Sequence, residues 1–427
     1  MSMQVAASTG ILDRARIARA ADWLAVAVAA SLPWSTSASG VLIALWLVAV
    51  IPTLDLTSLR RAMAMPAAAI PAALVLLGLV GMTWADATLA EKFGSFKPFL
   101  RLLILPLLFV QFRNSERGMW VLSAFLVSCT GVLALSWVLA AFPALSWRTI
   151  GPPTVPVKDY VIQSSEFLLC AFALTHLAIS AWQADRRRQA RAFALLALAF
   201  FANIAYVATA RSTVVIFAAF LPLLAFQRVE RKRALVVIAA GLVLAGLAWI
   251  SSPNLRERVL AVGQEIQQYQ TENRENSSSW RLEFWKKSIR FIADAPLFGH
   301  GTGSVMGLFR SAATGESGLS ATVTDQPHNQ TLLIAVQLGL LGVALLFAMW
   351  LSHLLLFRGR GLVSWLAVGV VVQNIVACLF NSYLFEFTLG WVYIFGVGVL
   401  GGMVLRHDGR AAGKDPDSAV APGDEGR

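Results

Sequence analysis

The chain has 427 residues, of which 57% are hydrophobic and only 14% are charged. Apolar runs of roughly 15 to 25 residues recur along almost the whole length, as helices that cross the hydrocarbon core of a bilayer require. This composition excludes a soluble protein. Because the runs lack the alternating pattern of barrel strands, it predicts an all-α, polytopic integral membrane protein.

Twelve apolar runs, separated by helix-breaking segments, predict about twelve transmembrane helices. They lie at 21–34, 40–54, 67–84, 98–112, 118–142, 162–182, 191–208, 212–227, 234–251, 329–356, 362–380 and 388–405. The first run follows three arginines and has the features of a cleavable signal peptide ending near Ser37, but we expect it to be retained as a helix.

The basic residues predict how the chain is oriented in the membrane. A formal charge of +11 would suggest a nucleic-acid partner in a soluble protein, but here most Lys and Arg lie in short links between apolar runs. With the N-terminus inside, every short internal link is basic, for example at Arg60-Arg61 and at 186–188. We therefore expect both termini in the cytoplasm, no nucleic-acid partner, and one long external loop.

These expectations divide the chain into four parts. Transmembrane helices 1–9 occupy residues 1–251, the external loop 252–328, transmembrane helices 10–12 residues 329–405, and a disordered cytoplasmic tail 406–427. The tail is rich in Gly, Pro, Asp and Lys and has almost no large apolar residue, which is typical of disorder.

The external loop contains two predicted amphipathic helices. Residues 254–275 are polar but carry Leu, Val and Ile at helical spacing, residues 276–279 break that helix, and residues 280–293 form a second one. In the second helix Trp280 and Trp285 alternate with arginines and lysines. This pattern is typical of a helix at the membrane interface, where cations can meet phosphate groups.

His328 is the candidate for acid–base chemistry. Of the five histidines only His300 and His328 lie on the external side, and we assign His300 no role. His328 and Asn329 stand where the tenth helix begins, with Gly339 and Gly342 further along it, which allow close packing against a neighbour. The alternative is that His328 only caps the helix.

Arg211 is the candidate for anion binding. It lies in a short link between the seventh and eighth helices, without an acidic residue nearby in sequence. A charge at the membrane boundary must be paired or face water, so its partner is either a distant glutamate or an anionic ligand, unless it simply extends to the surface. Lys97 and Arg101, at the external start of the fourth helix, pose the same question, and a structural role is the alternative for them.

Other chemistries lack support in the sequence. The external carboxylates form no spaced acidic pair suited to a divalent metal, and the three cysteines lie in apolar runs without CxxC spacing. The Gly-His-Gly-Thr-Gly segment at 299–303 has no preceding strand, so a nucleotide-binding loop is not predicted. We therefore expect neither a metal nor a cofactor.

A transporter is the main alternative from another class of protein. It would predict inverted repeats, helices interrupted near the middle of the membrane, and ionisable residues at that depth. The sequence shows neither repeats nor such interruptions, since the mid-helix positions are mostly Ala, Leu, Val and Phe. The polar residues of interest gather at the outer boundary, which favours an enzyme.

Three segments resemble the O-antigen ligases, and more broadly their superfamily with O-antigen polymerases and bacterial protein O-oligosaccharyltransferases. The most specific is His-Asn at 328–329, followed after nine residues by Gly-Leu-Leu-Gly at 339–342. The Ala-Arg-Ser at 210–212 resembles a helix-opening arginine segment of the superfamily. The stretch 280–299, from Trp-Arg to Pro-Leu-Phe-Gly, resembles its external loop segment.

The resemblance implies an enzyme of the bacterial inner membrane, with its active site facing the periplasm. Such ligases transfer a glycan from undecaprenyl pyrophosphate to a sugar hydroxyl of lipid A core, in contact with membrane lipids. His328 would be the general base, Arg211 and Arg281 would bind the pyrophosphate, and transfer would be metal-independent and inverting. Lys97, Arg101 and Asn329 are secondary candidates for substrate binding. A polymerase and a protein O-oligosaccharyltransferase remain alternatives; enzymes of the latter class commonly carry an additional C-terminal domain, so the length of 427 residues favours a ligase.

Overall fold

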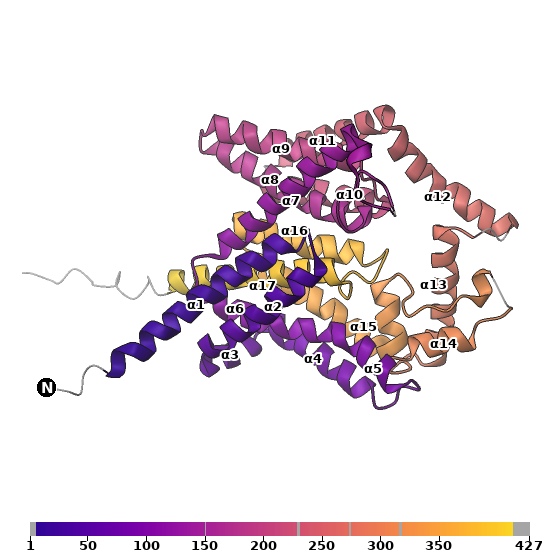
Figure 1. The fold of residues 1–427 in the computed structure, drawn as a ribbon, viewed down its shortest axis with the longest axis horizontal. Coiled ribbons are helices and arrows are strands. Elements are labelled where there is room, and N and C mark those ends of the chain that lie inside the picture. Colours follow the sequence, from indigo (N-terminus) through magenta and orange to yellow (C-terminus); the bar gives the residue numbers. More distant parts are fainter. Residues whose placement is uncertain (1–5, 150, 229–230, 273–274, 316–317, 413–427) are drawn as a thin grey trace, which may run out of the picture.

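The computed structural model describes residues 6–149, 151–228, 231–272, 275–315 and 318–412. Within these ranges the chain is all-helical and has no β-strand (Figure 1). The helical class predicted from the apolar runs is confirmed.

Each predicted apolar run coincides with a helix of the structure. These helices are α1 (Ala6–Ser31), α2 (Thr36–Val50), α4 (Pro66–Gly81), α6 (Ile104–Asn114), α7 (Gly118–Ala141), α8 (Tyr160–Gln183), α9 (Arg187–Tyr206), α10 (Arg211–Arg228), α11 (Arg231–Ser251), α15 (Gln330–Leu356), α16 (Leu362–Ala377) and α17 (Phe387–Ala412). By length and composition, seven helices in the described part of the chain can cross a membrane, or up to nine if each of two bent pairs is one span. A polytopic membrane protein is therefore supported, and the number twelve stays a prediction.

Two helix ends differ from the prediction. The fourth predicted helix begins as a 3-10 helix, η2 (Lys97–Leu103), which continues into α6. In an α-helix the ring of Pro106 would clash with the carbonyl of Leu102, four residues earlier, which favours the tighter turn there. Helix α17 runs to Ala412, and near its end Arg406 donates to the carbonyl of Ser115 at 3.0 Å. The first residues of the predicted disordered tail are thus helical, and residues 413–427 lie outside the described part of the chain.

The remaining helices lie in the connections. They are α3 (Leu56–Met63), α5 (Leu89–Phe96), α12 (Pro253–Glu272), α13 (Ser277–Asp294), α14 (Val305–Ser311), η1 (Ile51–Thr53), η3 (Pro143–Leu145) and η4 (Leu319–Ala321). Helices α12, α13 and α14 gather at one end of the molecule, opposite the beginning of α1 (Figure 1). That the N-terminus and the long loop lie on opposite sides of the membrane stays a prediction.

Helices α12 and α13 are the two amphipathic helices predicted in the long loop. Helix α12 leaves α11 at a bend of 91°. Helix α13 begins earlier than predicted, because Asn276 is its N-cap and accepts hydrogen bonds from the backbone N–H groups of Ser278 at 3.1 Å and Ser279 at 2.9 Å. The expected break is therefore the cap and first turn of α13, a start that fixes the direction of that helix.

Helix α17 packs closely against α6 in the middle of the bundle (Figure 1). In lipid the attraction between helices comes from close contact more than from exclusion of water, so small residues are favoured where helices meet. At this interface three glycines of α17 lie directly against large side chains of α6. The pairs are Gly398 with Leu108, Gly401 with Phe109, and Gly402 with Phe112.

Helix α15 is interrupted at Gly339, where φ is 64° and ψ is −162°. The segment 296–303 docks at this interruption and satisfies the freed backbone groups: Leu340 N–H donates to Pro296 O at 2.8 Å and His300 N–H donates to Val336 O at 2.9 Å. The expectation of uninterrupted helices was wrong here. The Gly-rich segment 299–303 is thus a docking element of the fold, in which each of its three glycines has positive φ.

The prediction that Gly339 and Gly342 allow close packing against a neighbour holds for Gly339 but not for Gly342. A Cβ atom on Gly339 would overlap the backbone of Leu297, so this position does admit a neighbouring segment. A Cβ atom on Gly342 would instead meet Leu338 of the same helix. Residues 339–342 and 296–299, which both belong to the segments that resemble O-antigen ligases, therefore contact each other in the fold.

Candidate active site

A cleft of about 230 Å³ lies where α8, α10, α12 and α13 approach the link between α16 and α17. Three arginines and one glutamate line it, together with two tyrosines that cover its sides. These residues are Arg211, Arg258, Arg281, Glu265, Tyr160 and Tyr383. The structure thus brings together Arg211 and Arg281, the two residues predicted to bind an anion.

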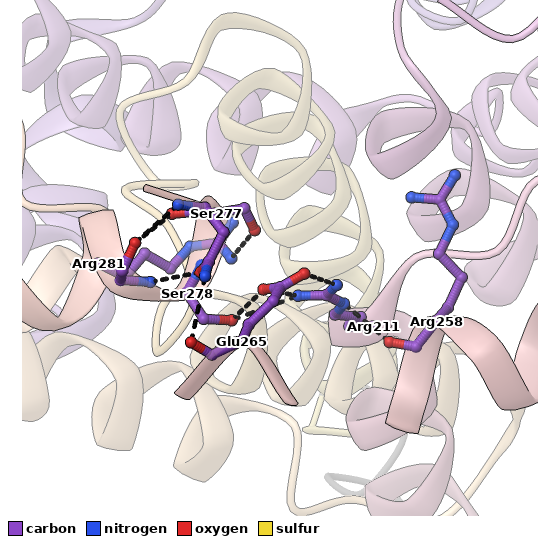
Figure 2. A network of polar contacts seen from close by, with 8 residues as sticks. Arg211, Arg258, Glu265, Ser277, Ser278 and Arg281 are labelled. Carbon is purple, nitrogen blue, oxygen red and sulfur yellow. Dashed lines mark hydrogen bonds and ion pairs between the residues drawn. The ribbon is translucent and has the colours of Figure 1, made fainter. Parts of the chain in front are cut away.

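Arg211 opens α10 and has the distant acidic partner that the sequence left as one alternative. Its Nη1 and Nη2 atoms donate to the two carboxylate oxygens of Glu265 at 2.8 and 2.5 Å, a two-pronged ion pair (Figure 2). Its Nε donates to the backbone carbonyl of Arg258 at 2.8 Å. Arg211 is therefore held in one orientation in the wall of the cleft.

Glu265 joins the arginine to the start of α13. Ser278 donates to the Glu265 carboxylate at 2.6 Å and accepts from Arg211 at 3.3 Å (Figure 2). The side-chain amide of Asn276 donates to the Glu265 carbonyl at 3.1 Å. The cap of α13 is thus bonded directly to the Arg211 ion pair.

Arg281 lies one turn further along α13 and has few partners. Its Nη1 reaches the hydroxyl of Ser277 at 3.5 Å (Figure 2). Its Nε is buried and has no hydrogen-bond partner among the described residues. A buried donor without a partner is costly, so this guanidinium is suited to an anion that enters the cleft.

Arg258 is a cleft residue that the sequence reasoning missed. Helix α12 was predicted from its apolar face. Arg258 lies on the neighbouring face, where a solvent-exposed charge is the usual expectation. Its guanidinium lies 5.0 Å from the centre of the Tyr160 ring, a cation–π contact. Nothing in the sequence alone indicated that these two residues meet.

His328 has positive φ, 54°, and lies just before Asn329, the N-cap of α15. Its Nδ1 is 3.0 Å from Oδ1 of Asn381. Because an amide oxygen only accepts, Nδ1 carries the proton and Nε2 keeps a free lone pair. The ring also stacks on Phe284 of α13, with 6.0 Å between ring centres. The helix-cap alternative is thus answered: Asn329 is the cap, and His328 precedes it.

The surroundings of His328 lower the pKa of its imidazole, which favours the neutral form. Burial lowers its pKa, the hydrogen bond to Asn381 raises it, and the nearby charge of Arg281 lowers it again. His328 does not itself line the cleft. It is connected to it through Asn381, which lies in the link that contributes Phe380 and Tyr383 to the cleft wall.

The secondary candidates have structural contacts away from the cleft. Arg101 donates to the backbone carbonyl of Glu386 at 2.6 Å and lies over the ring of Phe387. Lys97 is exposed and does not line the cleft. Asn329 accepts from the N–H of Leu332 at 3.1 Å as the cap of α15. None of the three lines the cleft that contains Arg211.

The imidazole of His300, to which no role was assigned, lies 2.8 Å from the carbonyl of Phe291. This contact ties the Gly-rich segment to the end of α13. Among the described residues, no group of three or more His, Cys, Asp or Glu side chains is close enough to hold a metal ion.

The fold and the cleft define a polytopic membrane protein with an arginine-lined cleft at one end of its helix bundle. Residues 193–347 match the family model described as O-antigen ligase, which confirms the resemblance over the segment from α9 to the middle of α15. That segment contains Arg211, Arg258, Glu265, Arg281 and His328. Among curated proteins, none matches the chain.

Proposed function

We propose that this protein is an O-antigen ligase, which transfers a glycan from undecaprenyl pyrophosphate to a sugar hydroxyl of lipid A core at the periplasmic face of the inner membrane. The observation that carries the proposal is the arginine-lined cleft beside a neutral histidine, within the segment that matches the O-antigen ligase family. Both termini would be cytoplasmic, with α12 and α13 on the periplasmic side.

A second cavity supports a lipid-linked donor. It is apolar, has a volume of about 370 Å³, and lies between α8, α9, α10, α11 and α12. Successive residues divide the two cavities: Ser212 and Arg258 line the cleft, whereas Thr213 and Val259 line the apolar cavity. An amphiphile with a diphosphate head and a hydrocarbon tail matches this pair of cavities.

In the proposed reaction the arginines bind the diphosphate and His328 activates the acceptor. The acceptor oxygen forms a bond to the anomeric carbon as the bond from that carbon to the diphosphate oxygen breaks. Nε2 of His328 takes the hydroxyl proton, and undecaprenyl pyrophosphate leaves with the bonding electrons. Attack opposite the leaving group inverts the anomeric centre.

Arg211 and Arg281 would stabilise the charge that develops on the leaving diphosphate. A guanidinium stays charged at a membrane surface and can bind two phosphate oxygens at once. The diphosphate is already an activated leaving group, so the proposal requires neither ATP nor a metal ion. Retained stereochemistry in the linked product would contradict the mechanism.

The test is transfer by the purified protein from undecaprenyl-pyrophosphate glycan to lipid A core, with a chelator present, comparing wild type with His328→Ala. Product from wild type alone is the expected result, and full activity of His328→Ala would contradict the role of the histidine. His407→Ala is the matched control, because this histidine is exposed near the end of α17 and does not line the cleft. Elongation of the donor glycan in place of transfer would make the protein a polymerase, and transfer to a protein hydroxyl would make it a protein O-oligosaccharyltransferase.

A further inference from the structure

Arg258 is placed to bind a ligand but has no assigned role. Among the described residues its guanidinium donates no hydrogen bond and pairs with no carboxylate, although it is half-buried and lines the cleft. The ring of Tyr160 supports it from one side, at 5.0 Å from the ring centre. Its own carbonyl accepts from Nε of Arg211 at 2.8 Å, so the positions of the two arginines are coupled.

All three arginines line the same cleft. In the view of Figure 2, Arg211 lies between Arg281 on one side and Arg258 on the other, with Glu265 bound to Arg211. A ligand that extends along the cleft would meet all three. Arg258 and Arg281 have no carboxylate partner among the described residues, whereas Arg211 is already paired.

The charges of the cleft add up to a definite value. Three guanidinium groups and the one carboxylate of Glu265 leave a net of two positive charges. A diphosphate esterified at both ends carries one negative charge on each phosphate. The cleft with Glu265 in place therefore balances a diphosphate diester, whereas without Glu265 it would favour more highly charged anions such as free pyrophosphate.

We propose that Arg258 is a third diphosphate-binding residue and that Glu265 sets the charge of the cleft to match a diphosphate diester. This inference rests on the proposed function, because the diester is the headgroup of the proposed donor. Glu265 acts through Arg211 and through the net charge, so it is a positioning residue. Arg258 would contact the phosphate oxygens directly.

The first experiment compares Arg258→Ala with wild type in binding undecaprenyl pyrophosphate and in the KM for the glycan donor. We expect binding of this diphosphate lipid to weaken, and the donor KM to rise, by about tenfold or more, the usual contribution of a hydrogen bond to a charged group. The dependence of both quantities on ionic strength should also become weaker, which a purely structural role would not cause. Arg256→Ala, on the same helix but outside the cleft, is the matched control. Binding by Arg258→Ala equal to wild type would overturn the inference.

Arg258→Lys and Arg258→Gln separate a loss of binding from a loss of folding, because both keep a long polar side chain at this position. The lysine variant keeps the charge without the planar fork, so its loss should be smaller than that of alanine, and the glutamine variant should behave as alanine does. Equal binding by Gln, Lys and Arg at this position would overturn the inference.

The second experiment measures Glu265→Gln against two ligands, inorganic pyrophosphate and a diphosphate diester. Removing one negative charge should shift the ratio of affinities in favour of the more highly charged pyrophosphate, even if Arg211 is less well held. An unchanged ratio would overturn the role of Glu265. If diphosphate binding depends on Arg258 but the protein transfers no glycan, the inference stands and the proposed function is rejected. If the protein transfers glycan and Arg258→Ala binds and transfers as wild type does, the proposed function stands and the inference is rejected.

Discussion

Replacing Gly339 by alanine should destabilise the protein, because this glycine allows the loop segment 296–303 to dock into α15. Its φ of 64° and ψ of −162° lie in a region essentially restricted to glycine, where another residue costs about 1–3 kcal/mol. A Cβ atom would also overlap the backbone of Leu297. Relieving that overlap would separate the segments and break the bonds from Leu340 N–H to Pro296 O and from Leu341 N–H to Leu297 O.

Each of these two hydrogen bonds contributes about 0.5–1.5 kcal/mol, so with the backbone strain the total loss is about 2–6 kcal/mol. The assay is thermal unfolding of the purified protein in detergent, where Gly339→Ala should lower the apparent melting temperature by several degrees. Glycan transfer should fall as well, because the docked segment joins α13, which carries Arg281, to the helix that follows His328.

Gly263→Ala is the matched control. Gly263 lies within α12, and a Cβ atom there would meet nothing within 4 Å. Alanine is favoured over glycine inside a helix by about 1 kcal/mol, so this variant should melt no lower than wild type. If Gly339→Ala has the same melting temperature as wild type and transfers glycan normally, the docked segment does not stabilise the site.

Three further predictions concern the histidine. Because burial lowers the pKa of His328 below its usual 6.5, the neutral base persists to lower pH, and kcat/KM should fall only on the acid side of pH 6.5; an acid limb centred above that value would contradict the assignment. Asn381→Ala removes a bond that raises this pKa and fixes the tautomer, so the acid limb should move to still lower pH while kcat falls, and a limb moving upward would contradict it. Trp285→Phe removes the N–H that donates to the Pro327 carbonyl at 3.1 Å and holds the chain before His328. In stopped assays at varied donor concentration, kcat should fall about 2- to 10-fold while the donor KM stays unchanged. A change in KM alone would assign Trp285 to donor binding.

Local patterns were enough to predict the helices. The apolar runs located twelve of the helices, since lipid leaves the backbone no partner outside the helix and composition alone marks such segments. The helical spacing of apolar residues located α12 and α13. These patterns could not predict the interruption at Gly339. That break is stabilised by Pro296 and His300, about forty residues earlier in the chain, and a glycine in an apolar helix is equally common where two helices pack.

The site was predictable in part for the same reason. Arg211 was noticeable because no acid stands near it in sequence, and its partner Glu265 is 54 residues away, which no spacing rule connects. His328 could be singled out by its external position, whereas its neutral tautomer depends on Asn381, 53 residues further on. Arg258 gave no signal, because a charge beside the apolar face of an amphipathic helix is usual.

Helix α13 joins the two halves of the proposed chemistry. At its start Ser278 and Asn276 are bonded to Glu265, and through it to Arg211. In its middle Phe284 stacks on the ring of His328, and Trp285 bonds to Pro327. The residues proposed to bind the diphosphate and the proposed base thus lie on different elements, but α13 contacts both groups. A change in how α13 is capped should therefore alter donor binding and base strength together, because one rigid element positions both.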